Sequence, residues 1–235
     1  IIYIDLMAST SLDMFHENGT PKYDTSISIS SGTKAYRYFG LLILLNIFNR
    51  GKLLVCSPIS SNPDAYSLTW NAEREILTYI GEFKTTLIEC FNSDARFIVI
   101  TLSLHYIDSG HANYVFIDKG INLGKDGKEM IAIRLEPFGF CNTCKHYEPD
   151  ILDEKLKEVL NLIAKEANDD FNVRLLGKEA DISSHGPQKH ELCEQRMTGK
   201  QIFINTGLCS SHAFFTLYSM FKLIIDGTID ISEKE

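Results

Sequence analysis

Three apolar runs rich in β-branched and aromatic residues follow one another in the middle of the chain and limit what it can fold into. They occupy residues 96–106, 111–118 and 130–138, and runs of this composition and length are typical of strands. A short turn separates the first pair, and a longer segment with three glycines separates the second pair. Consecutive strands joined in this way form an antiparallel meander. The sequence therefore predicts an α+β fold with an antiparallel central sheet.

Segments with helical spacing of apolar residues lie on both sides of this predicted sheet. We expect helices at residues 33–48, 71–91, 151–167 and 209–225. The second of these would bury a stripe made by Ile76, Ile80, Phe83 and Leu87. A short strand is expected at residues 172–176. The chain divides in this interpretation into a helical N-terminal elaboration at residues 1–95 and a core at residues 96–235.

Charge and hydropathy exclude several kinds of partner. The 235 residues include 23 Lys and Arg against 31 Asp and Glu, a formal net charge of −8. An acidic chain lacks the basic surface that binds nucleic acid or anionic lipid. The longest dense apolar run, at residues 39–48, is too short to span a bilayer. No signal peptide is apparent at the start, which is Ile1, so we expect a cytoplasmic protein.

The six cysteines are too few for a disulfide-rich scaffold and predict thiols in a reducing compartment. Cys141 and Cys144 form a CxxC pair with His146 close behind. Cysteine and histidine are zinc ligands, and a second ligand pair could come from His185, His190 and Cys193. A redox pair and two ordinary loop thiols are the alternatives, so the sequence leaves metal binding open.

Two residues of neighbouring predicted strands have the chemistry of a catalytic base and its orienting acid. His111 opens the second strand, and Glu136 lies near the end of the third. In an antiparallel pair the start of one strand faces the end of the next, so we expect these side chains to meet on one face. A carboxylate there would hold the imidazole in one tautomer and stabilise its cation.

Cys209 supplies a candidate nucleophile at the start of the last predicted helix. The helix dipole, the free backbone N–H groups and a nearby imidazolium all favour a thiolate. The same N–H groups can bind an oxyanion, and Gln188 could add a side-chain donor. Each residue also has an ordinary interpretation: Cys209 as a core residue, His111 and Glu136 as strand-end polar groups, and Gln188 as a loop amide. His105 and His212 compete with His111 for the role of base.

The order His, acidic residue, Gln, Cys resembles the adenain-like cysteine peptidases. This group includes adenovirus endopeptidase, the ubiquitin-like-protein (sentrin) proteases and related thiol peptidases of large DNA viruses, to which the resemblance is closest. It covers roughly residues 96–225, through the segments GHAN at 110–113, RLEPFG at 134–139, GPQ at 186–188 and GLC at 207–209. The sequence departs from the sentrin pattern at Ala112, where a Trp is usual, and at Leu208 and Ser210, where Asp and Gly are usual.

The resemblance implies a papain-like arrangement and a cysteine peptidase. Cys209 would be the nucleophile, His111 the general base and then acid, Glu136 the orienting residue, and Gln188 part of the oxyanion hole. Its substrates would be peptide or isopeptide bonds of ubiquitin, a ubiquitin-like protein or a viral polyprotein, and no cofactor is expected.

Two other functions stay open at this point. The same His, Glu, Cys order occurs in the Yop-type acetyltransferases, which the stretch LEP at residues 135–137 also resembles. A non-catalytic interaction module, with or without zinc, is the third interpretation.

Overall fold

A computed structural model describes most of the chain, as segments at residues 29–50, 54–59, 66–106, 110–120, 128–136, 148–176 and 208–225. Its strands form one seven-stranded sheet. They are β1 (Val55–Cys56), β2 (Ser67–Asn71), β3 (Ile76–Thr78), β4 (Phe97–His105), β5 (Gly110–Asp118), β6 (Lys128–Leu135) and β7 (Phe171–Leu176). The helices are α2 (Ile29–Arg50), α3 (Gly81–Asn92), α4 (Pro149–Ala167) and α6 (Leu208–Ile225).

The sheet is mixed, whereas the sequence predicted an antiparallel one. The strand order is β3-β2-β4-β5-β6-β7, and β1 also pairs with β4. The predicted meander of β4, β5 and β6 is confirmed as antiparallel. The β1–β4, β2–β4 and β6–β7 pairs are parallel. Parallel neighbours need a long crossover connection. The β2–β4 connection contains β3 and α3, and the β6–β7 connection contains α4.

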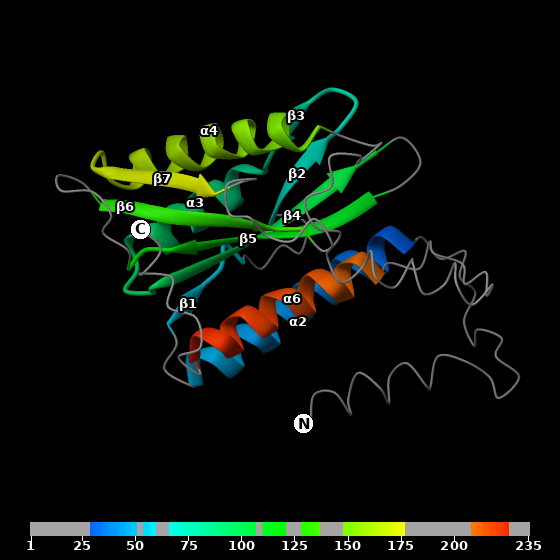
Figure 1. The fold of residues 1–235 in the computed structure, drawn as a ribbon, viewed down its shortest axis with the longest axis horizontal. Coiled ribbons are helices and arrows are strands. Elements are labelled where there is room, and N and C mark those ends of the chain that lie inside the picture. The colour runs from blue at the N-terminus through cyan, green and yellow to red at the C-terminus, as the bar shows by residue number, and fades with distance from the viewer. Residues whose placement is uncertain are drawn as a thin grey trace, which may run out of the picture.

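Helices cover both faces of the sheet (Figure 1). One core contains residues of α3 and α4, and the other contains residues of α2 and α6, which lie together on the opposite face. The continuous apolar run at β4 is explained by burial of this strand on both faces. Ile98 and Ile100 face α3 and α4, while Phe97 and Val99 face α2 and α6. A strand buried on both faces is therefore apolar along most of its length.

The helix predicted at residues 71–91 is wrong over its first half. Strand β2 runs to Asn71, a turn follows, and β3 pairs back antiparallel before α3 begins at Gly81. Glu75 has a positive φ of 51°, a conformation that a helix cannot contain. Of the predicted stripe, Phe83 and Leu87 are buried, whereas Ile76 and Ile80 are each 48% exposed.

Strands from both sides of residue 95 belong to the same sheet. Strands β1, β2 and β3 precede that position, yet β1 and β2 both pair with β4. The division into residues 1–95 and 96–235 stays a prediction. In the described part of the chain, no helix has both the length and the apolar character needed to cross a membrane.

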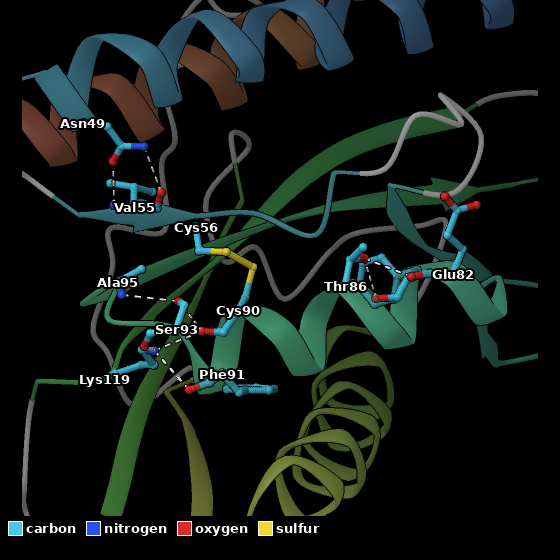
Figure 2. The surroundings of a disulfide bond; sticks show 11 residues. Asn49, Val55, Cys56, Glu82, Thr86, Cys90, Phe91, Ser93, Ala95 and Lys119 are labelled. Carbon is cyan, nitrogen blue, oxygen red and sulfur yellow. Dashed lines mark hydrogen bonds between the residues drawn. A yellow bond between two sulfur atoms is a disulfide. The ribbon is translucent and has the colours of Figure 1, made fainter.

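Two of the cysteines are joined, so the prediction of six thiols is wrong for this pair. A disulfide connects Cys56 of β1 with Cys90 of α3, whose Cα atoms are 5.6 Å apart (Figure 2). The residues are 34 positions apart in sequence, and only the parallel docking of β1 beside β4 brings them together. The same region is held by Asn49, whose side-chain amide exchanges two hydrogen bonds with the backbone of Val55.

Candidate active site

His111 and Glu136 form a buried pair on neighbouring strands. Nε2 of His111 lies 2.5 Å from Oε1 of Glu136, and the two residues are 8% and 6% exposed. The predicted contact between these side chains is confirmed. Because Glu136 engages Nε2, a proton exchanged with a nucleophile would have to pass through Nδ1.

The register of β5 and β6 explains this contact. Tyr114 lies opposite Leu135, so one step further Asn113 lies beside Glu136, and His111 follows two residues away on the same face. Side chains two residues apart share a face of a strand, and diagonal neighbours across strands are within reach of long side chains. A local hairpin register is therefore sufficient to bring the imidazole and the carboxylate together.

Asn113 and Arg134 hold the other oxygen of the Glu136 carboxylate. Nδ2 of Asn113 donates to Oε2 at 2.9 Å, and Nη1 of Arg134 lies 3.4 Å from the same oxygen. Both supporting side chains are fully buried. Neither residue was predicted as part of the site, although each lies two residues from a predicted site residue along its strand, which is the spacing of a shared face.

The burial of the Glu136 carboxylate determines how its charge must be balanced. A carboxylate removed from water is costly unless charged or polar partners replace its hydration. The described partners of Glu136 are His111, Asn113 and Arg134. The carboxylate in turn favours the imidazolium form of His111, which is the form that stabilises a neighbouring thiolate.

Cys209 is the second residue of α6, and the described contacts of that helix place its beginning near the start of β5. Near its other end, the ring of Phe221 lies 5.4 Å from that of Phe116 and 6.0 Å from that of Phe97. Phe97 begins β4 and pairs with Asp118, the last residue of β5. Helix α6 therefore runs alongside β5 in the same direction, as Figure 1 shows. Its first turn points toward the end of the sheet where β5 begins.

The His111–Glu136 pair and the helix that carries Cys209 lie on opposite faces of the sheet. His111 and Asn113 alternate with Tyr114 and so share the face covered by α3 and α4, whereas α6 covers the other face. A meeting of Cys209 with His111 therefore requires the first turn of α6 to reach the rim of the sheet where β5 starts. The side chain of Cys209 lies outside the described residues.

His105 becomes the principal competitor for the role of base. It ends β4 opposite Gly110 and is exposed. Because it alternates with Leu104, which faces α3 and α4, it lies on the face that α6 covers. The described contact of the Glu136 carboxylate with an imidazole is made to His111.

The remaining predicted residues lie outside the described part of the chain. This applies to Gln188 and to the CxxC pair, Cys141 and Cys144, together with the other candidate zinc ligands, His146, His185, His190 and Cys193. Among the described residues, no group of three or more histidine, cysteine or acidic side chains could hold a metal ion.

Comparisons with known proteins find only distant structural similarity. No family model matches the chain, and the search of curated proteins finds no match. Among solved structures, a crystal structure of the Legionella pneumophila effector protein RavZ is 12% identical, with a TM-score of 0.39. The alignment covers 73% of this chain and 42% of the RavZ chain.

A second RavZ structure, in complex with human LC3B, is also 12% identical, with a TM-score of 0.36 and coverage of 74% and 42%. This chain thus spans about two fifths of the length of the RavZ chains it matches. Similarity at this level assigns the chain to no family.

Proposed function

We propose that this protein is a thiol-dependent hydrolase of peptide or isopeptide bonds. The observation that carries the proposal is the buried His111–Glu136 pair, because a histidine oriented by a buried carboxylate is the base that such a reaction needs. Cys209, at the start of α6, is the nucleophile. The sequence resemblance to adenain-like and sentrin peptidases supports the same assignment.

The proposed reaction has two steps. In the first, the Cys209 thiolate attacks the carbonyl carbon, the C–N bond breaks, and the amine leaves with a proton from the His111 imidazolium. In the second, His111 takes a proton from water, the resulting hydroxide attacks the thioester, and the C–S bond breaks to release the acid and the thiolate. Backbone N–H groups at the start of α6, and Gln188, would bind the oxyanion.

The substrate class follows from the sequence resemblance. It suggests the C-terminal bond of ubiquitin or of a ubiquitin-like protein. A Yop-type acetyltransferase would use the same Cys209 thioester but pass the acyl group to an amine or hydroxyl instead of water. An interaction module would form no thioester at all.

A ubiquitin that carries an electrophile at its C-terminus tests the proposal. We expect a covalent adduct that mass spectrometry locates at Cys209, lost in Cys209→Ala and reduced at least tenfold in His111→Ala. His105→Ala is the matched control and should react like the wild type. Labelling by acetyl-CoA without hydrolysis of ubiquitin conjugates would indicate the acetyltransferase. Absence of both reactions, in a folded protein, would favour the interaction module.

A further inference from the structure

The support of Glu136 extends from the sheet to a helix through a buried arginine. Arg134 is fully buried in β6, and its Nε and Nη2 lie 2.5 Å and 3.2 Å from the two carboxylate oxygens of Asp153 in α4. Its Nη1 faces Glu136 at 3.4 Å. A guanidinium stays protonated in a protein, so Arg134 is buried as a cation and needs these carboxylates.

Among the described ion pairs of this cluster, the charges balance when His111 is protonated. The cluster contains one guanidinium, two carboxylates and one imidazole, contributed by Arg134, Asp153, Glu136 and His111. With both carboxylates ionised, the net charge is −1 when the imidazole is neutral and zero when it is protonated. In a buried site the neutral total is favoured. Asp153 therefore favours the imidazolium although it does not touch His111 in any described contact.

The orientation of the Arg134 guanidinium also determines which oxygen of Glu136 faces His111. The two-point contact with Asp153 fixes the plane of the guanidinium, as paired N–H groups do with a carboxylate. The described contact of Arg134 with Glu136 is then made by Nη1, which lies 3.4 Å from Oε2. Oε1 is thereby left to His111. Without Asp153, Arg134 would be able to turn and compete with the imidazole for Glu136.

We propose that Arg134, anchored by Asp153 of α4, is a positioning residue that keeps the Glu136 carboxylate directed at His111. The catalytic consequence rests on the proposed function. The effect on the His111 ring can be measured without any activity.

Asp153→Asn tests the proposal, with Glu154→Gln as the matched control. Both remove one carboxylate from α4, but Glu154 is exposed and has no described contact with Arg134. We expect the pH midpoint of the His111 ring, followed by NMR of 15N-labelled histidine, to fall by about 0.5–1 unit in Asp153→Asn. The control should leave it in place. In Asp153→Asn, kcat for a ubiquitin-derived substrate should fall about tenfold, with KM unchanged.

Two further variants distinguish a loss of positioning from misfolding. Asp153→Glu keeps the carboxylate and should restore most of the midpoint and of kcat. Arg134→Lys keeps the charge but loses the two-point contact, and it should lower kcat at unchanged KM. An unmoved midpoint and unchanged kcat in folded Asp153→Asn would overturn the proposal. A shifted midpoint in a protein whose wild type hydrolyses nothing would support the positioning role and overturn the proposed function instead.

Discussion

The His111 imidazole meets the Glu136 carboxylate through Nε2, at 2.5 Å from Oε1, in a site where both residues are buried. A contact of this kind orients the ring and stabilises its cation, so its removal has a predictable consequence. Glu136→Gln keeps the shape of the side chain but loses its charge. We expect kcat to fall at least about 10²-fold, because the imidazolium loses its partner.

The measurement is the pH dependence of kcat for the wild type and for Glu136→Gln. The acidic limb reports the essential histidine in the substrate complex. Because the Glu136 carboxylate stabilises the imidazolium, we expect this limb at higher pH in the wild type than in Glu136→Gln. A limb at lower pH in the wild type would show that His111 is not the base. Equal kcat in the two proteins would therefore remove Glu136 from the mechanism.

Cys209→Ala should abolish hydrolysis and leave the fold intact. The residue lies in the first turn of α6, whereas the described core contacts of that helix are made further on, at Ala213, Leu217 and Phe221. The far-ultraviolet circular dichroism spectrum and the melting temperature should match those of the wild type. Full activity in this variant would show that another group is the nucleophile.

Cys209 should be the thiol that alkylates fastest at mildly acidic pH. A free thiol has a pKa of about 8.5, and a helix start together with an imidazolium favours its thiolate. His111→Ala should raise the pH midpoint of labelling by iodoacetamide, measured site by site with mass spectrometry. His105→Ala is the control. A larger change in the His105 variant would make His105 the base, consistent with its place on the α6 face.

The Cys56–Cys90 disulfide should stabilise the fold. It closes a loop over 34 positions of sequence, for which chain entropy suggests about 3–4 kcal/mol. We expect reductant to lower the midpoint of urea unfolding in the wild type. The double variant Cys56→Ser with Cys90→Ser should be insensitive to reductant and match the reduced wild type. An oxidised wild type that unfolds like the double variant would contradict the prediction.

Lys119 should stabilise the C-terminal end of α3. Its Nζ donates to the backbone carbonyls of Cys90, Phe91 and Ser93 at 2.9, 3.1 and 2.6 Å, as Figure 2 shows. These carbonyls carry the negative end of the helix dipole. Lys119→Met should lower the free energy of unfolding by about 1–2 kcal/mol.

Lys155→Met serves as the control for this prediction. Lys155 makes an exposed ion pair with Glu158 at 2.8 Å, and such pairs contribute little to stability. Chemical denaturation of the two variants and the wild type compares them directly. An equal loss in both variants would show that the carbonyl contacts of Lys119 add nothing specific.

The sequence alone predicted the elements whose signals are local. The meander of β4, β5 and β6, the amphipathic helix α4 and the helix α6 all followed from periodicity within a short window. The meeting of His111 and Glu136 belongs here as well. It depends only on the pairing of two consecutive strands, and an antiparallel hairpin sets that pairing locally.

Tertiary structure decided the features that join distant segments. Periodicity within one segment could not show that β1 and β2 pair parallel to β4, that Cys56 reaches Cys90, or that Asp153 anchors Arg134 from α4. It also could not show which face of the sheet α6 covers. A residue's spacing along one element gives the face it occupies, but the packing of whole elements decides what that face meets, because burying apolar surface on both sides of the sheet is a property of the complete fold.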